Sequence, residues 1–207
     1  MSQKPEILSV EEYKTDAKWL KLENIKWKDQ TGKERGWEAA NRSTRSKAGV
    51  DSVHILAILD HPSKPPSTII IEQFRPPAGA TVIELPAGLV DEGEDAESTA
   101  LRELHEETGY GTGKSGDGVS VEDVSSVLVK DPGMTGANFN LVTVKVKLNE
   151  NDPEPEQHLE EGEHIVKRVV PLKDLYDVLQ TYAKDGFVVD GLLGSIALGW
   201  KLAGKYA

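Results

Sequence analysis

The stretch GLVDEGEDAESTALRELHEETGY, residues 88–110, is the feature that most constrains the fold. It carries five acids from Asp91 to Glu97 and three more glutamates after them, although neighbouring like charges repel. Residues 96–108 contain no glycine or proline, and Gly109 is a typical C-terminal stop, so we predict a helix over 96–108. The fold must therefore place an acidic helix where its charge is tolerated.

Helical geometry puts Glu103, Glu106 and Glu107 on one face, while Leu101 and Leu104 fall on another that can pack on a sheet. A one-sided carboxylate cluster is costly unless it is screened or binds a cation, and hard oxygen ligands suit Mg²⁺ or Mn²⁺. We expect these glutamates to face solvent when no metal is bound. The plainer alternative is a solvated acidic helix face.

The spacing of the fixed residues decides between these two interpretations. The pattern runs Gly88, five residues, Glu94, seven residues, Arg102-Glu103-Leu104, one residue, Glu106-Glu107, one residue, Gly109 and Tyr110. It resembles the Nudix box at every fixed position, and chance would give it at about 10⁻⁸ per start site from average composition. The resemblance implies an α/β fold: a Nudix α/β/α sandwich with a mixed sheet, preceded by a small N-terminal antiparallel β domain.

A Nudix hydrolase cleaves a nucleoside diphosphate linked to another moiety, and it uses Mg²⁺. The resemblance implies two to three Mg²⁺ ions, with Mn²⁺ as a substitute. It gives Arg102 the role of orienting a carboxylate through a charge-assisted bond, and Glu107 a place in catalysis as well as in metal binding. The implied metal ligands are the carbonyl of Ala87 and the side chains of Glu94, Glu103, Glu106 and Glu107, with Glu94 in or near the metal shell.

Three further segments extend the resemblance over nearly the whole chain. They are the N-terminal run at 18–45, QFRPP at 73–77 and DPGMT at 131–135. Together with the box, they are similar to the eukaryotic ADP-ribose (ADP-sugar) pyrophosphatase group. Arg75, beside two prolines in a rigid turn, also suits phosphate or ribose binding on chemical grounds.

That group implies roles for residues outside the box. Trp19 and Trp37 stack on adenine, one from each subunit of a homodimer that exchanges its N-terminal region. Arg42 and Arg75 contact the phosphates or the terminal ribose, and Met134 lies near that ribose. Glu163 is the general base or orients the water, with Glu160 and Glu161 as alternatives. The plainer alternatives are packing for the tryptophans, ion pairs for the arginines, an ordinary loop residue for Met134 and a hydrated acidic loop for Glu163.

The resemblance predicts hydrolysis of ADP-ribose, and of related ADP-sugars, to AMP and ribose 5-phosphate. Two alternatives stay open: hydrolysis of other or oxidised nucleoside diphosphates, and a non-catalytic ligand sensor. A sensor is disfavoured because such domains commonly lose box carboxylates, and here all are present. A Ca²⁺-binding helix–loop module is disfavoured because DEGEDAESTALR lacks the required alternation of oxygen ligands.

Composition limits the partners. The net charge is −11, which opposes nucleic-acid binding, so a small nucleotide-sugar is the expected partner. The chain has no cysteine, which favours a reducing compartment, the cytoplasm with the nucleus as alternative. The apolar stretch at 187–204 is interrupted by Asp190 and Lys201, so we expect a buried C-terminal helix and no membrane span.

Periodicity and turn residues organise the rest of the chain. We predict residues 1–48 to be an N-terminal hairpin region for dimerisation and adenine stacking, and 49–207 to be the Nudix domain. The hairpin strands are expected at 18–28 and 35–45. Further strands are expected at 50–60, 68–74, 121–129 and 140–148, with helices at 172–185 and 189–203. The glycine-rich loop at 109–118 has no assigned role.

Overall fold

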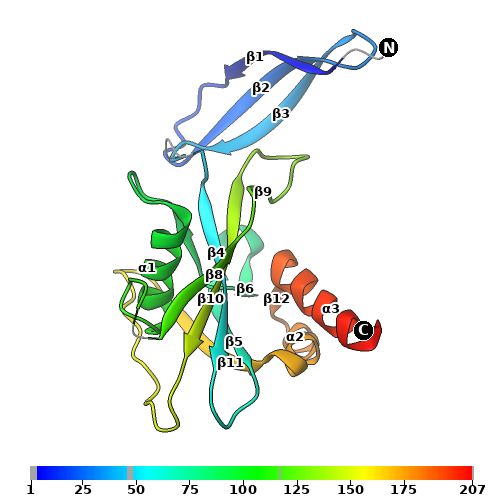
Figure 1. Cartoon of the computed structure of the whole chain (residues 1–207). Helices are drawn as coiled ribbons and strands as arrows, with labels where there is room; N and C mark the ends of the chain where they lie inside the picture. The colour runs from blue at the N-terminus through cyan, green and yellow to red at the C-terminus, as the bar shows by residue number, and fades with distance from the viewer. Residues whose placement is uncertain (1–3, 46–48, 117, 207) are drawn as a thin grey trace.

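The structure is a computed structural model that describes residues 4–45, 49–116 and 118–206. Within these residues the strands form two separate sheets (Figure 1). The strands are β1 Glu6–Glu12, β2 Leu20–Lys28, β3 Glu34–Arg42, β4 Ser52–Asp60, β5 Ser67–Arg75, β6 Ala80–Glu84, β7 Ala87–Leu89, β8 Val119–Val124, β9 Leu128–Val129, β10 Asn138–Lys147, β11 Ile165–Pro171 and β12 Val188–Val189. The helices are α1 Ala96–Thr108, α2 Leu175–Lys184 and α3 Gly191–Tyr206, with short 3₁₀ turns at Pro76–Ala78 and Leu172–Asp174.

The N-terminal sheet has three antiparallel strands in the order β1-β2-β3, not the two of the predicted hairpin. Strand β1 was not predicted, because its apolar residues Ile7, Leu8 and Val10 are all exposed and no alternation of buried and polar positions marks it. The sheet rests on the loop before β10. The amide of Ala40 donates to the carbonyl of Met134 at 3.0 Å, and the amide of Gly136 donates to Asn41 Oδ1 at 2.7 Å.

The central sheet is mixed and runs β12-β6-β5-β4-β10-β8, with β11, β7 and β9 paired to β5, β4 and β10. Two pairs are parallel, β4 with β10 and β12 with β6, and the other ladders are antiparallel. The short strands β6, β7 and β12 were not predicted. They contain three residues of buried core at most, too few for a periodic pattern to be read from sequence.

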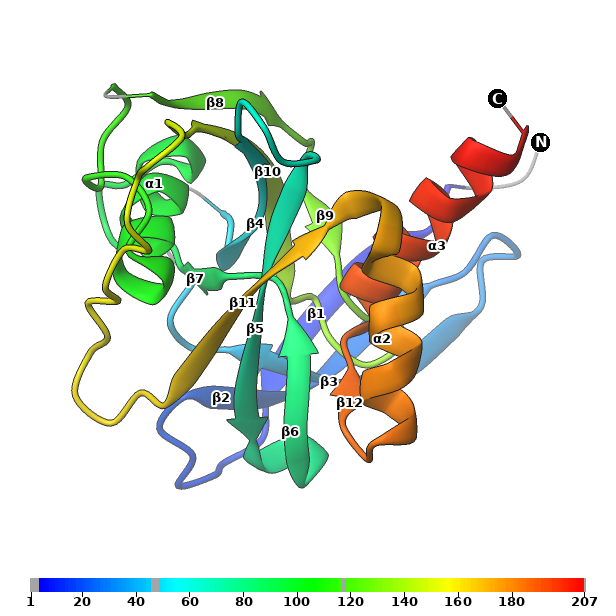
Figure 2. The same ribbon diagram turned by 90° about the horizontal axis from the view of Figure 1, so that it is seen from below.

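Helices cover both faces of this sheet, α1 on one side and α2 with α3 on the other (Figures 1 and 2). Each interface has its own apolar core. Leu101 and Leu104 of α1 pack on β4 and β10, and Leu179 and Leu193 of α2 and α3 pack on Ile70 of β5 and neighbouring residues. The predicted α/β/α sandwich with a separate N-terminal antiparallel sheet is confirmed.

The strand predicted at 121–129 is two strands. Ser125 separates them, because its hydroxyl accepts from the amide of Leu141 and its carbonyl accepts from Asn140 Nδ2. These bonds stand beside a single backbone bond from the Ser125 amide to the Leu141 carbonyl at 2.9 Å, and the register between β8 and β10 shifts nearby.

The prediction that the C-terminal helix is buried was wrong for most of its length. In α3 the buried side chains are Leu193 and Ala197, while Leu198, Trp200 and Leu202 are exposed. The apolar packing of the helix is limited to its first turns, and beyond them Lys201 contacts α2 through Asp177 at 2.7 Å and the ring of Tyr176. In the described part of the chain, no helix is long and apolar enough to cross a membrane. The domain boundary expected at 48/49 borders residues 46–48, which lie outside the described residues, so it stays a prediction.

Candidate active site

Helix α1 has the bounds that the sequence predicted, and its ends explain why. Asp95 and Ser98 form a reciprocal capping box at the N-terminus. Gly109 ends the helix in the left-handed region with φ of 78°, and a Cβ there would lie 2.0 Å from the carbonyl oxygen of Glu156. Glycine is therefore required at this position both by the backbone angle and by the adjacent loop.

Arg102 gathers the carboxylates of the box. Its guanidinium binds Glu94 in a two-point contact, Nε to Oε1 and Nη2 to Oε2, both at 2.9 Å. Its Nη1 donates to Glu103 at 2.8 Å and to Glu106 at 3.0 Å. Both oxygens of Glu94 are thus in use, since Thr99 also donates to Oε2. The ion pair with Arg102 holds the pKa of Glu94 below its usual range.

Glu107 lies apart from this network and accepts from the amide of Ala87 at 2.8 Å. It is only 3% exposed, so the expectation that the box glutamates face solvent was wrong for Glu107 and, in large part, for Glu103. The reason is that β7 runs against α1. A Cβ on Gly88 would come within 1.7 Å of Glu103 Oε1, so the absence of a side chain at Gly88 makes room for that carboxylate.

The electrostatics of the Glu103 and Glu107 carboxylates suit the binding of a cation. Burial raises the pKa of Glu107 to about 8 and that of Glu103 to about 7, and the charge of Glu163 adds to both shifts. Within the described residues no three acidic or histidine side chains converge on one point, because Arg102 holds Glu103 and Glu106. The hard oxygens of Glu103 and Glu107 beside the Ala87–Gly88 backbone match the ligands that Mg²⁺ prefers.

Glu163 comes from the acidic loop before β11. Its amide and carboxylate bond to the carbonyl and amide of Glu160, both at 3.1 Å, which closes a tight turn. The loop is fastened to the end of α1, since Gln157 Nε2 donates to the carbonyl of Glu107 at 2.6 Å and the His158 amide donates to that of Glu106 at 2.8 Å. The helix that carries the box and the loop that carries Glu163 are therefore held together.

Arg75, at the end of β5, donates from Nε to Glu84 Oε1 at 2.7 Å. A group that the sequence analysis missed surrounds this pair. Asp190 donates its amide to the carbonyl of Ile83, next to Glu84. The ammonium of Lys130 lies 5.8 Å from the ring of Phe139, and burial lowers its pKa, with Arg42 and Arg75 adding to the effect. These residues come from separate loops and strand ends, so no local spacing could have signalled them.

His54 is the other residue that the sequence analysis missed. It pairs with Ala87 in register, contacts the edge of Phe139 at 4.8 Å between ring centroids and is 4% exposed. Burial lowers its pKa to about 3, and neither ring nitrogen has a partner among the described residues. A neutral imidazole therefore lies next to the backbone of Ala87, whose carbonyl would be a metal ligand.

The tryptophans lie on the N-terminal sheet with half-exposed rings, 59% for Trp19 and 50% for Trp37. Trp37 donates its indole N–H to the carbonyl of Gly133 at 3.0 Å, and Met134 next to it is exposed. The backbone of Trp19 is opposite Ser43, just past the end of β3 and six residues from Trp37, so the backbones of the two tryptophans are about 20 Å apart in one chain. A single chain does not bring them face to face.

His105 within the box has a buried Nδ1 with no hydrogen-bond partner among the described residues. Its ring stacks on His158 of the acidic loop at 4.4 Å between centroids. The contact is another link between α1 and that loop.

The profile of the NUDIX domain matches residues 51–188, two thirds of the chain. This chain belongs to the NUDIX family, and the family predicted from the box is confirmed. The ADP-ribose pyrophosphatases of this family use divalent metal ions, generally Mg²⁺.

Several relatives match nearly the whole length of this chain. The chain is 42% identical to an uncharacterised Nudix hydrolase of Schizosaccharomyces pombe, over 99% of this chain and 97% of the relative. It is 40% identical to the ADP-ribose pyrophosphatase of Saccharomyces cerevisiae, over 93% and 81%, and 32% identical to the ADP-sugar pyrophosphatase of Mus musculus, over 95% and 88%. A crystal structure of an ADP compounds hydrolase has the same fold, with a TM-score of 0.60 at 21% identity over 100% of this chain and 98% of that one.

Proposed function

We propose that this protein hydrolyses the diphosphate of ADP-ribose, and of related ADP-sugars, to AMP and the sugar phosphate. The observation that carries the proposal is the pair of buried carboxylates, Glu103 and Glu107, packed against the Ala87–Gly88 backbone with Arg75 and Glu163 in electrostatic reach. The names of the yeast and mouse relatives supply the substrate class.

Different residues bind the metal ions, handle the proton of the attacking water and stabilise the charge on the phosphate. Ala87, Glu103, Glu106 and Glu107, with Glu94 nearby, would hold two to three Mg²⁺ ions, with Mn²⁺ as a substitute. When bound, such ions offset the charge of the diphosphate and lower the pKa of a water. Glu163 accepts or orients the proton of the water that adds to phosphorus, as the bond from phosphorus to the bridging oxygen breaks. Arg75, held by Glu84, stabilises the charge that builds on the phosphate oxygens.

The substrate's adenine is assigned to Trp19 and Trp37, and its phosphates or terminal ribose to Arg42, Arg75 and Met134. Because the backbones of Trp19 and Trp37 lie about 20 Å apart in one chain, we expect the clamp to need a homodimer in which each subunit contributes one ring. Cytoplasmic or nuclear location and the absence of nucleic-acid partners stay predictions from composition.

Product analysis tests the proposal. The protein is incubated with ADP-ribose and about 5 mM Mg²⁺, and AMP is quantified against EDTA and Glu107→Gln controls. We expect metal-dependent AMP release, much faster than from NAD⁺ or dinucleoside polyphosphates, and a loss of turnover by orders of magnitude in the variant. A folded protein that releases no AMP would point to another nucleoside diphosphate or to a sensor. A near-normal rate for Glu107→Gln would overturn the assignment of the carboxylates.

A further inference from the structure

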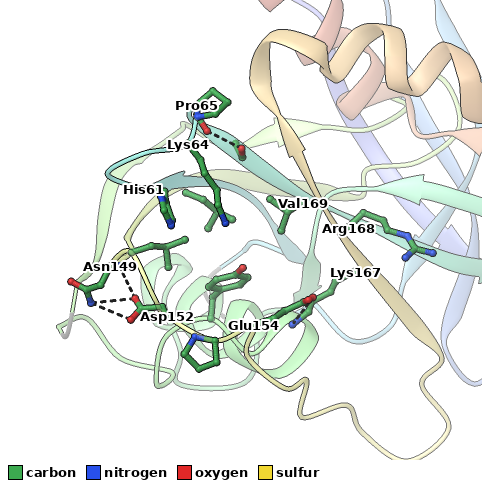
Figure 3. Close-up of a pocket in the computed structure, with 14 residues that line it drawn as sticks. His61, Lys64, Pro65, Asn149, Asp152, Glu154, Lys167, Arg168 and Val169 are labelled. Carbon is green, nitrogen blue, oxygen red and sulfur yellow. Dashed lines mark hydrogen bonds and ion pairs between the residues drawn. The ribbon is translucent and has the colours of Figure 1, made fainter.

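A cavity lies between the C-terminal end of β4 and the residues that follow α1, and none of the box carboxylates lines it (Figure 3). Its volume is about 370 Å³, within the range of small-molecule sites. Leu59 of β4 lines it, whereas His54 of the same strand pairs with Ala87 at the active site. Leu59 is five positions beyond His54, which places these two residues about 17 Å apart along the strand.

The hydrogen-bonding groups that remain unused in this cavity are donors. Lys64 extends into it and makes no hydrogen bond or ion pair within the described residues (Figure 3). Tyr110 is 9% exposed, and its hydroxyl has no partner in the described part of the chain. His61 accepts from the amide of Ser63 at Nδ1, so its neutral ring carries the proton on Nε2.

Lys167 adds an ammonium that is held in place. Its side chain is 8% exposed, and its Nζ donates to the carbonyl of Thr108 at 2.9 Å and to that of Pro155. One of its three N–H groups stays available. Lys167 therefore presents a fixed charge at the floor of the cavity, beside the end of α1.

The acceptors in the cavity are either used or at its rim. The carboxylate of Asp152 accepts from the amide of Asn149 at 2.7 Å and from its side-chain nitrogen. The side chain of Glu154 is 76% exposed, and its Oε1 lies 3.9 Å from Lys167 Nζ. The donor Arg168 is already paired, since its Nε lies 2.8 Å from Glu72 Oε1. Lys64 and the Tyr110 hydroxyl therefore have no acceptor within the described residues, and the carboxylate nearest to Lys167 Nζ, that of Glu154, lies 3.9 Å away.

Apolar side chains form the rest of the wall: Leu59, Pro65, Leu148, Pro153 and Val169. They suit an organic body next to the anionic group. We propose that this cavity binds a small phosphate monoester, whose phosphate lies between Lys64, Lys167 and the Tyr110 hydroxyl and whose organic part rests on the apolar wall. The site is separate from the Nudix carboxylates and does not depend on the proposed function.

Calorimetric titration in EDTA, which disfavours metal-dependent binding at the carboxylates, tests the site. The probes are AMP, ribose 5-phosphate, inorganic phosphate and, as the ligand without phosphate, adenosine. We expect saturable binding of at least one monoester and none of adenosine. Lys64→Gln and Tyr110→Phe each weaken this binding about tenfold or more, because each removes a hydrogen bond to a charged group. Lys114→Gln, which changes the same charge on an exposed loop, leaves it unaltered.

Equal affinity in wild type, Lys64→Gln and Tyr110→Phe would overturn the proposal, as would the absence of monoester binding. Binding that is lost in Trp37→Ala and retained in Lys64→Gln would place the ligand in the adenine site and overturn it too. Circular dichroism of each variant confirms that it is folded. Because no turnover is measured, the result is independent of whether ADP-ribose is the substrate.

Discussion

At the scale of single residues, the protonation of Glu107 links stability to metal binding. Its pKa rises from 4.5 to about 8 because the side chain is buried. A group with a higher pKa in the folded chain holds its proton more tightly when folded, so stability falls as pH rises from 4.5 to about 8. In EDTA we expect Glu107→Gln to melt about 3 °C or more above wild type at pH 8.5, with the difference vanishing near pH 5.

Thermal melting followed by circular dichroism checks this expectation. Addition of Mg²⁺ at pH 8.5 should raise the Tm of wild type and leave that of Glu107→Gln nearly unchanged, because the cation replaces the proton on the buried carboxylate. Identical melting of the two proteins across the pH range would show that Glu107 is not held protonated by burial.

Gly88 gives a second expectation at the same scale. Because a Cβ at this position would lie 1.7 Å from Glu103 Oε1, Gly88→Ala must displace the carboxylate. Its backbone angle is one that alanine can adopt, so the fold should persist. We expect kcat to fall about 100-fold or more through loss of a metal ligand, with a higher Mg²⁺ requirement. Gly199→Ala on exposed α3, where the added Cβ has no neighbour, is the control and should keep full activity.

At the scale of elements, the junction between α1 and the acidic loop determines where Glu163 lies. Gln157 donates to the carbonyls of Glu107 and Ile165, and replacement by leucine leaves both carbonyls without this donor. We expect Gln157→Leu to lose about 1–3 kcal/mol of unfolding free energy in urea. Its kcat should fall while KM stays nearly constant, because the loop that carries Glu163 loosens and the adenine contacts are remote. A lowered stability with unchanged kcat would mean that the loop holds its place without Gln157.

The elements also show what could be predicted from sequence. Helix α1 was predicted with its correct bounds because Gly109 is a local stop signal and residues 96–108 contain no glycine or proline. Strand β1 and the split at Ser125 were missed because long-range partners determine them, β2 for the one and β10 for the other. The same limit applies to the site, where the box predicted Glu103 and Glu107 but not Lys130, which reaches the site only through tertiary packing.

At the scale of the whole molecule, the N-terminal sheet exposes apolar side chains that one chain does not cover. Exposed side chains include Ile7, Val10, Trp19, Leu20 and Leu22. Exposed apolar side chains on a three-stranded sheet favour association, because burial of apolar area is the main driving force for subunit contact. These side chains are the part of the structure that best supports the homodimer.

The separation of Trp19 and Trp37 allows the dimer to be tested through activity. If each adenine site takes one ring from each subunit, Trp19→Ala and Trp37→Ala should each raise KM for ADP-ribose about tenfold or more through lost stacking. When the two variants are mixed, unfolded and refolded together, about half of the dimers are mixed, and each has one intact site and one doubly altered site. The mixture should then recover about one quarter of the wild-type activity at low substrate concentration. If both rings acted within one chain, or if neither stacked on adenine, mixing would recover nothing beyond the average of the two variants.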